Sequence, residues 1–408
     1  MPELERPIVA ASVHLVAGKA TDSVTYGFLP AAARLGLDVT LLTDRPALYR
    51  SGPHAFGGPV VECDVSDFRD IVAHVADGAP GGGNLAAGDP GGGEPAAIFS
   101  NSDFLQAPTA LAAAYFGLPA KDWRAATRAK NKGLMRRHLA VIDPVFSADA
   151  RRVPADAPYP LVVKPREGVA SEDVFLVHDA AELAARVGEI SARRDDPLVA
   201  EEYLPGHLHT LETLGDGREL RVLGSFRTTL SPPPFFVEER LEWAEPPAET
   251  PQVLRQLEEL GIGFGACHTE FVVHEGRARI IEVNYRLIGD HCDFLLADLL
   301  GVPLFEQILK VHLGEPLPGV RVPQPRHAIA EPVIADRSGT LTSAPGPLRL
   351  ADGPVQLFYR PQRAVGDSVA VTRTNRDYLG TVRAIGPGPD EVNAALARFR
   401  AAHDWTIT

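Results

Sequence analysis

The chain has 408 residues, of which 45% are hydrophobic and 23% charged, a composition typical of globular proteins with two or three domains. Its 53 acidic residues outnumber 40 basic ones, giving a net charge of −13. Nucleic acid and anionic membranes are therefore not expected as partners, because both need clustered positive charge. Three cysteines without metal-ligand spacing, no signal-peptide pattern and no membrane-length apolar run predict a cytoplasmic protein with free thiols.

Residues 1–120 alternate strand patterns with helix patterns. PIVAASV and LDVTLLT are typical of buried strands, and TYGFLPAAARLG and DVSDFRDIVAHVA of helices. This order predicts a parallel sheet with helices on both faces. The Gly- and Pro-rich residues 77–95 are expected to form a flexible surface insertion. They contain no Lys, Arg, Ser or Thr, which argues against a phosphate-binding loop.

The remaining chain divides into three further parts. Residues 121–197 hold a basic helical run, WRAATRAKNKGLMRRHLAVI, and then the strand YPLVVKP, a loop and another helix capped by Asp179. Residues 198–314 begin with the strand LVAEEYL and include HTEFVV and ARIIEVN, two strands joined at Glu275-Gly276, which is a hairpin signal. Residues 315–408 alternate short strands with turns and close with a helix.

The second hairpin strand carries polar residues at alternate positions. Glu282, Asn284 and Arg286 are expected to share one face, opposite Ile281, Val283 and Tyr285. If the turn holds an odd number of residues, Glu270 falls opposite Glu282 or its neighbour. Two carboxylates and an amide oxygen suit Mg²⁺ and not zinc. A solvated face paired with surface arginines explains any one of these residues alone, but the set together favours a metal site.

Phosphate ligands should accompany such a metal. Lys164 ends a buried strand beside a Gly/Ser loop, although this loop lacks the common P-loop spacing and a surface turn is an equal alternative. Lys132 is a second candidate, and its alternative is a solvated helix face among other basic residues. Tyr203 and Leu204 follow an apolar strand and could line a pocket for a planar base, with an ordinary strand end as the alternative.

Taken in this order, these pieces resemble the ATP-grasp superfamily of carboxylate–amine ligases over nearly the whole chain. NKGLMRRHL resembles the family's first-lysine helix, LVVKPREGVAS its second-lysine strand and glycine loop, AEEYLPG its adenine-holding linker, and HTEFVV with IIEVNYRLIGD its metal-binding hairpin. The implied α/β fold has an N-terminal Rossmann-like pre-ATP-grasp domain (1–120), two α+β ATP-grasp subdomains (121–197 and 198–314) and a C-terminal α+β extension (315–408).

The resemblance also implies cofactors and residue roles. ATP and Mg²⁺ are expected, with Mn²⁺ as a substitute for Mg²⁺. By this resemblance, Lys132 and Lys164 would contact the α- and β-phosphates, and residues 168–171, from Gly168 to Ser171, would cover the β- and γ-phosphates. Glu202, Tyr203 and Leu204 would hold adenine, and Glu270, Glu282 and Asn284 would bind the metal. Arg286 and Gly289, together with Lys164, would act at the reacting groups.

Two departures from the family pattern affect these roles. Leu208 stands where many members have a ribose-binding glutamate, and Glu212 is the candidate substitute. The glycine loop also carries Glu172 and Asp173, whose charge would repel phosphate unless both side chains point outward.

The implied reaction activates a carboxylate as an acyl phosphate and condenses it with an amine, releasing ADP and phosphate. Expected partners are small carboxylates and amines, in the manner of amino-acid or siderophore-type ligases, with a homodimer as the family's usual assembly. Residues 231–243 and 289–301 are expected to line the acceptor side, with Arg227, His268, Asp290 and His291 as candidate contacts and structural roles as their alternative. The rival functions are a carboxylase, a phosphotransferase and a silent ATP-binding protein. An oxidoreductase is disfavoured because no Gly-rich turn follows the first strand.

Overall fold

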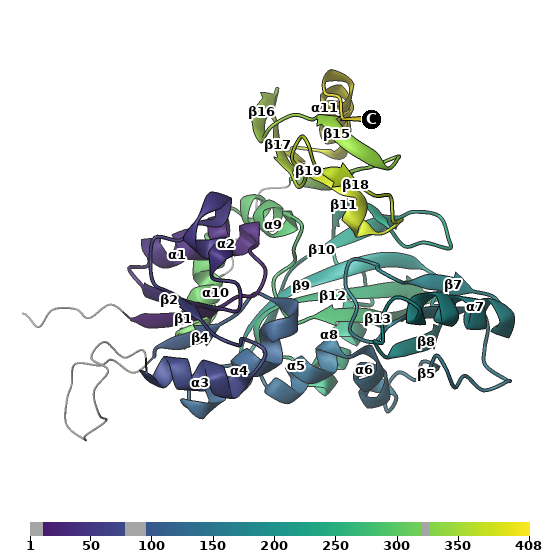
Figure 1. Cartoon of the computed structure of the whole chain (residues 1–408), viewed down its shortest axis with the longest axis horizontal. Coiled ribbons are helices and arrows are strands. Elements are labelled where there is room, and N and C mark those ends of the chain that lie inside the picture. Colours follow the sequence, from purple (N-terminus) through teal and green to yellow (C-terminus); the bar gives the residue numbers. More distant parts are fainter. Residues whose placement is uncertain (1–10, 78–94, 320–325) are drawn as a thin grey trace, which may run out of the picture.

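The computed structural model describes residues 11–77, 95–319 and 326–408, so the predicted insertion at 77–95 lies outside the described residues except at its two ends. In Figure 1 the N-terminal α/β part lies on the left, a large sheet runs across the middle to a small sheet on the right, and the C-terminal part lies above. None of the helices in the described ranges is long and apolar enough to cross a membrane.

The N-terminal sheet is parallel, as predicted, with the order β3-β2-β1-β4. Its strands are β1 (Ser12–Val16), β2 (Asp38–Thr43), β3 (Val60–Glu62) and β4 (Ala97–Phe99). Its helices are η1 (Ser23–Phe28), α1 (Leu29–Arg34), α2 (Ala47–Arg50), η2 (Gly52–His54), α3 (Phe68–Asp77), η3 (Asp103–Leu105) and α4 (Gln106–Tyr115). The chain adds β2 and β3 on one side of β1 and then places β4 on its other side, so the strand order changes direction between β1 and β4. A crevice opens at the carboxyl ends of these two strands.

The large sheet has nine strands in the order β13-β12-β9-β10-β11-β14-β19-β17-β16. Its first five are β9 (His207–Asp216), β10 (Leu220–Leu230), β11 (Glu238–Ala244), β12 (Phe264–His274) and β13 (Arg277–Asn284). The other four are β14 (His327–Ile334), β16 (Leu348–Asp352), β17 (Val355–Pro361) and β19 (Tyr378–Gly386). Because Leu241 and Glu242 pair with Ala330 and Ile329, these four strands of the C-terminal part continue the large sheet. The other described strands of the C-terminal part form a separate three-stranded sheet.

The small sheet is antiparallel and covers one end of the large one (Figure 1). It contains β5 (Ser147–Asp149), β6 (Leu161–Pro165), β7 (Phe175–Val177) and β8 (Leu198–Glu202). Helix α7 (Ala180–Ser191) packs on it and is capped by the Asp179 carboxylate, as predicted. The basic helical run is two helices, α5 (Trp123–Lys130) and α6 (Lys132–Leu139), because Asn131 leaves the helical conformation and its side chain caps α6.

Helices α5, α6 and α8 (Thr250–Leu260) pack together on one face of the large sheet (Figure 1), and α6 also contacts β5 of the small sheet. Their apolar side chains meet Phe271, Ile280 and Val283 in one core. Helices α9 (Cys292–Leu300) and α10 (Leu304–His312) return to the N-terminal part, where α10 packs against α1 and β4. The remaining elements are β15 (Gly339–Ser343), β18 (Ser368–Val369), η4 (Asn375–Asp377), α11 (Pro389–Ala402) and β20 (Thr406–Ile407).

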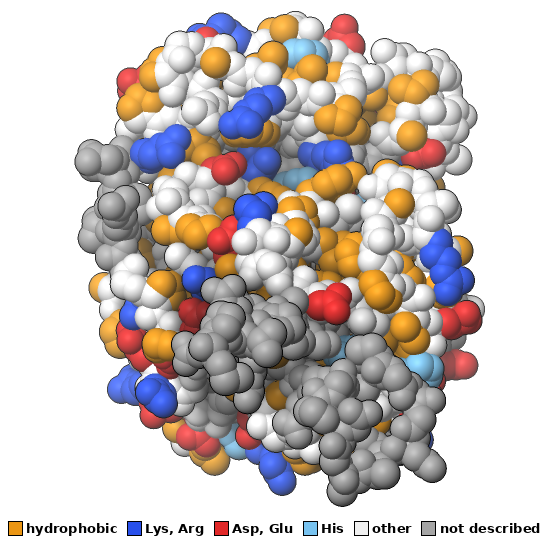
Figure 2. Space-filling view, turned by 90° about the vertical axis from the view of Figure 1, so that its left-hand side faces the viewer, with side chains coloured by type: hydrophobic (Ala, Val, Ile, Leu, Met, Phe, Trp, Pro, Cys, Tyr) orange, Lys and Arg blue, Asp and Glu red, His pale blue; other side chains and the backbone are white. Residues whose placement is uncertain are grey.

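Charge is unevenly spread over the surface. On the face shown in Figure 2, Lys and Arg side chains form a loose band across the upper half, and acidic side chains gather at the lower left. The surplus of acidic residues therefore does not make this whole face acidic.

Candidate active site

Three cavities meet around the β12–β13 hairpin. The nucleotide-side cavity, about 560 Å³, lies between the small and large sheets and is lined by Lys132, Lys164 and residues 201–204 among others. The hairpin cavity, about 230 Å³, is lined by both hairpin strands, the glycine loop and residues 375–378. The outer cavity, about 1030 Å³, lies at the carboxyl ends of β1 to β4. Glu270 and Glu282 line the first two cavities, and Arg286 and Gly289 line the second and third.

The predicted pairing of Glu270 with Glu282 is confirmed, although the turn holds two residues instead of an odd number and a β-bulge after Glu270 makes up the difference. Glu270 lies opposite Glu282 on neighbouring strands, and the turn places both Glu275 and Gly276 at positive φ. Val283 and Tyr285 pack into the core beneath, so Glu282, Asn284 and Arg286 face the cavity.

One hairpin residue departs from this expectation. Ile281, predicted to share the buried face with Val283, lines the nucleotide-side cavity instead. The pairing shifts by one residue between Glu270 and Phe271, and this β-bulge turns Ile281 to the other face.

Glu270, Glu282 and Asn284 converge as a set of oxygen ligands. Asn284 is buried, and the two glutamate side chains are each 19% exposed. The Lys132 ammonium lies 3.0 Å from Glu282, so a cation already faces one of the two carboxylates. Facing carboxylates repel unless a cation lies between or beside them. This donor set therefore fits a hard divalent cation such as Mg²⁺.

His268 supplies a second cation, which the sequence did not predict. Its Nδ1 lies 2.7 Å from Glu212 Oε1 and its Nε2 3.6 Å from Glu270 Oε1. Burial by itself would lower the pKa of His268, but the Glu212 and Glu270 carboxylates outweigh it and raise the pKa to about 10. The imidazolium thus holds Glu270 in place. Glu212 is buried against it and is not among the described residues lining the nucleotide-side cavity, so the structure does not bring Glu212 to a ribose.

Both predicted lysines are buried and line the nucleotide-side cavity. Lys132 is 4% exposed and donates to the Gly168 carbonyl, so its alternative placement on a solvated helix face is wrong. Lys164 pairs with Glu201 at 2.8 Å, and Arg136 pairs with the same carboxylate at 3.0 Å. Burial would raise the pKa of Glu201, but Arg136 and Lys164 lower it to about 2. Lys132 on α6 and Lys164 on β6 therefore each have a carboxylate partner, which is Glu282 for Lys132 and Glu201 for Lys164.

The acidic side chains of the glycine loop are paired with arginines from other segments. Glu172 pairs with Arg376 at 2.6 Å, and Asp173 pairs with Arg193 at 2.7 Å and with Arg194 at 3.1 Å. The backbone takes positive φ at Ala170, Ser171 and Asp173, and the Ser171 hydroxyl donates to the Phe236 carbonyl. Repulsion between a phosphate and these two carboxylates is thereby reduced, because arginines neutralise the charges of Glu172 and Asp173.

The strand end after Glu202 borders an apolar pocket. Leu204 packs with Val145, Leu208 and Val272 in one small cluster. The Glu202 carboxylate is held by Arg279 at 3.1 Å, so only its backbone is available to a ligand. Among the described residues, the Glu202 and Tyr203 amides have backbone partners and the Leu204 amide has none. This arrangement suits a planar base read by backbone groups.

The outer cavity joins three parts of the chain. Asp22, in the crevice after β1, accepts hydrogen bonds from Arg360 at 2.6 and 2.9 Å and lies 2.9 Å from His291 Nε2. Asp290 and His291 line this cavity. Arg227 and residues 231–236 lie along the nucleotide-side cavity, away from the predicted acceptor side.

Glu238, at the start of β11, is a further acid that the sequence analysis missed. It lines both the nucleotide-side and hairpin cavities. Burial first, and then the nearby Glu270 and Asp290 carboxylates, raise the pKa of Glu238 to about 8. VEER after a proline run has no motif signal, and only the sheet order places Glu238 beside the hairpin.

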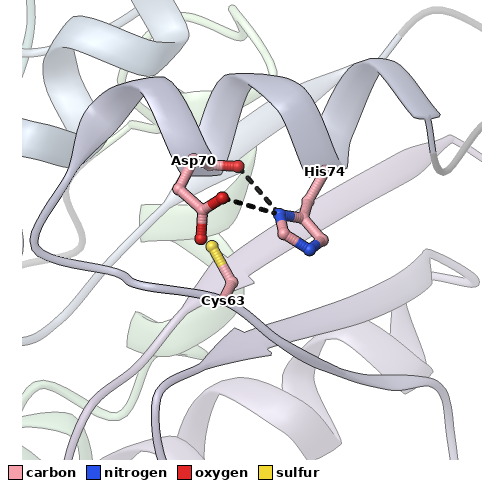
Figure 3. A group of neighbouring side chains, drawn as sticks. All are labelled: Cys63, Asp70 and His74. Atoms are coloured by element: carbon pink, nitrogen blue, oxygen red, sulfur yellow. Dashed lines mark hydrogen bonds and ion pairs between the residues drawn. The ribbon is translucent and has the colours of Figure 1, made fainter.

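A second group of possible metal donors lies at the end of β3. Figure 3 shows Cys63, Asp70 and His74, whose donor atoms lie within 4.8 Å of one another. His74 Nδ1 hydrogen-bonds to the Asp70 carbonyl, and the Asp70 carboxylate accepts from the Asp64 amide. Burial, and then the Asp70 carboxylate, raise the pKa of the Cys63 thiol to about 12. A metal needs the thiolate, so we assign these contacts to joining β3 with α3.

No protein-family model matches the sequence. The uncharacterized protein y4rH of Sinorhizobium fredii is 30% identical over 316 residues, which are 72% of this chain and 64% of that protein. The carbamoyl phosphate synthase large chain of Methanoculleus marisnigri is 23% identical over 208 residues, 46% of this chain and 18% of that one. The chain therefore spans less than two thirds of either relative.

Solved structures match nearly the whole chain. The L-amino acid ligase from Bacillus licheniformis is 20% identical, with a TM-score of 0.78 over 98% of this chain and 99% of that one. Phosphoribosylglycinamide synthetase from Anaerococcus prevotii is 12% identical, with a TM-score of 0.69 over 98% and 100%. Biotin carboxylase from Campylobacter jejuni is 16% identical, with a TM-score of 0.66 over 97% and 92%. The chain has the ATP-grasp fold.

Proposed function

We propose that the protein is an ATP-dependent ligase that activates a carboxylate as an acyl phosphate and condenses it with an amine, releasing ADP and phosphate. The observation that carries this proposal is the convergence of Glu270, Glu282, Asn284 and Arg286 on one small cavity. That cavity has a lysine-lined, partly apolar cavity on one side and a large cavity on the other.

The nucleotide-side cavity has the features that ATP requires. Leu204, Leu208 and Val272 offer an apolar slot for the base, and the free Leu204 amide offers one donor at its edge. Lys132 and Lys164 supply positive charge between this slot and the hairpin. Glycine-loop residues 168–171 border the same space and would cover the terminal phosphates.

Mg²⁺ fits the hairpin residues because two carboxylates and one amide oxygen are hard ligands that leave positions free for phosphate oxygens and water. Glu270, Glu282 and Asn284 would hold it. A bound Mg²⁺ would neutralise phosphate charge during transfer. Lys132 and His268, each beside one of the two glutamates, would keep these carboxylates ionised and oriented.

Arg286 stands at the junction of the hairpin and outer cavities, together with Gly289. A guanidinium there can hold the carboxylate to be activated and then the charge that develops on its oxygen. We infer that the outer cavity takes the carboxylate and the amine, since it lies in the crevice at the carboxyl ends of a parallel sheet. The enclosing loop would protect the acyl phosphate from water.

The first test is phosphate release from ATP across a matrix of amino acids, small di- and tricarboxylates and bicarbonate, with ADP and AMP distinguished. The ligase predicts ADP and phosphate only with a particular carboxylate–amine pair. Release with bicarbonate alone would indicate a carboxylase, to which the same fold is also similar. Formation of AMP and pyrophosphate would contradict the acyl-phosphate route.

A further inference from the structure

We propose that Arg376, from the C-terminal part, is a catalytic residue that contacts the terminal phosphate of ATP from the side opposite the hairpin. The proposal rests on the ligase function above and extends it, because it assigns part of the phosphate site to a segment with no motif of its own. Arg376 lies in η4, immediately before β19.

The first observation is the charge of the hairpin cavity. Four carboxylates line it, those of Glu238, Glu270, Glu282 and Asp290. Among the described residues that line it, Arg286 and Arg376 are the only arginines, and there is no lysine. His268 also lines it but is already paired with Glu212 and Glu270. Lys132, the partner of Glu282, is not among the described residues that line it. A phosphoryl group entering this space brings further negative charge, which a second arginine would help to neutralise.

The second observation is that the backbone around Arg376 is firmly held. The buried Asp377 carboxylate accepts hydrogen bonds from the Thr372 amide and hydroxyl and from the Arg373 amide. The Thr374 hydroxyl accepts one from the Arg376 amide. These bonds close a tight turn whose conformation does not depend on a ligand, so the Arg376 side chain starts from a fixed point.

The third observation is that this turn contacts both the glycine loop and the start of β11, which line the hairpin cavity. The Asn375 amide donates to the Ala170 carbonyl in the glycine loop. The Asn375 side-chain oxygen accepts from the Glu238 amide, and the Tyr378 hydroxyl donates to the Glu238 carbonyl. The C-terminal part is thus fastened to the loop that would cover the phosphates and to the start of β11.

The fourth observation concerns the guanidinium itself. Arg376 Nε donates to Glu172 of the glycine loop at 2.6 Å, while its two terminal nitrogens make no hydrogen bond to any described residue. An arginine has five N–H donors. Arg376 can therefore keep Glu172 through Nε and bind a phosphate oxygen through its terminal nitrogens. The Glu172 carboxylate, which would otherwise repel a phosphate, thus orients the Arg376 guanidinium.

The test compares Arg376→Ala and Arg376→Lys with Arg337→Ala, a matched control that removes an exposed, ion-paired arginine from the same C-terminal part. We expect Arg376→Ala to lower the kcat for phosphate release roughly 10²-fold, as for the loss of other preorganised charge donors. The affinity for ADP should change less than threefold, because ADP lacks the terminal phosphate that the group contacts. Arg376→Lys should recover only part of the rate, and Arg337→Ala should match the wild type.

A binding measurement separates this proposal from the function on which it rests. In the presence of Mg²⁺, the wild type should bind a non-hydrolysable ATP analogue more tightly than ADP, and Arg376→Ala should lose that preference even if no substrate pair has been found. The proposal is overturned if Arg376→Ala keeps both its rate and its preference for the triphosphate. It is equally overturned if ADP binding and the melting temperature fall together with the rate, which would mark a structural role. A wild type that binds neither nucleotide would overturn both proposals.

Discussion

Two clusters of charge lie near the hairpin, and they differ in how fully their charges are matched. In the first, the single buried carboxylate of Glu201 meets both Arg136 and Lys164. In the second, Glu238, Glu270, Glu282 and Asp290 share one cavity. Lys132 pairs with Glu282 and His268 with Glu270, while Glu238 and Asp290 have no ion-pair partner among the described residues. A cluster whose charges are balanced holds secondary-structure elements together. A cluster with excess carboxylates is stable only when a cation binds to it. We therefore take the first as structural support and the second as the place of chemistry.

Removal of Glu201 should cause the largest loss of stability. Glu201→Gln leaves Arg136 and Lys164 buried without their counter-charge, which should lower the free energy of unfolding by about 3–5 kcal/mol. Urea unfolding followed by circular dichroism measures it. A loss below about 1 kcal/mol would mean that this cluster is not the support we infer.

Removal of Glu282 should affect catalysis more than the fold. Glu282→Gln takes away a proposed metal ligand, so phosphate release should fall roughly 10²–10³-fold. It removes the partner of the buried Lys132 ammonium but also relieves repulsion with Glu270, so the melting temperature should fall less than in Glu201→Gln. Glu275→Gln, in the exposed turn of the same hairpin, is the matched control. Equal activity in the two variants would contradict the metal site.

The effect of Glu201 should depend on pH in a defined window. Its pKa is lowered to about 2 from a usual value near 4.5. A carboxyl whose pKa falls on folding contributes stability that is complete above pH 4.5 and is lost as the pH decreases towards 2. The difference in unfolding free energy between wild type and Glu201→Gln should shrink over this window by up to about 1.4 kcal/mol per pH unit. A constant difference between pH 5 and pH 2.5 would refute the assignment.

Addition of Mg²⁺ should stabilise the cluster that contains Glu270 and Glu282 and should leave the cluster around Glu201 unchanged. Mg²⁺ binding at 100 times its Kd should add about 2.7 kcal/mol to the unfolding free energy. A thermal-shift titration with Mg²⁺ measures this effect. The increase should persist in Glu275→Gln and disappear in Glu282→Gln. The same increase in both variants would place the ion elsewhere.

The sequence alone determined the hairpin and the parallel N-terminal sheet. The alternation of Glu282, Asn284 and Arg286 follows from strand geometry. The turn at Glu275-Gly276 joins their strand to that of Glu270, but the pairing of Glu270 with Glu282 also needs the β-bulge after Glu270. The Asp179 cap of α7 was equally predictable because it depends on a few adjacent residues. These features need only neighbouring residues, so local patterns suffice to predict them.

The tertiary structure decided the rest of the site. Glu238 reaches the hairpin cavity because the sheet order brings β11 close to the hairpin. Arg376 reaches it because β11 pairs with β14, more than 80 residues away, and carries the C-terminal strands into the same sheet. Lys132 is buried because α6 packs beside β8 and the glycine loop, although its neighbours in sequence suggest a solvated helix. Such contacts depend on the completed fold and leave no periodic signal in either segment alone.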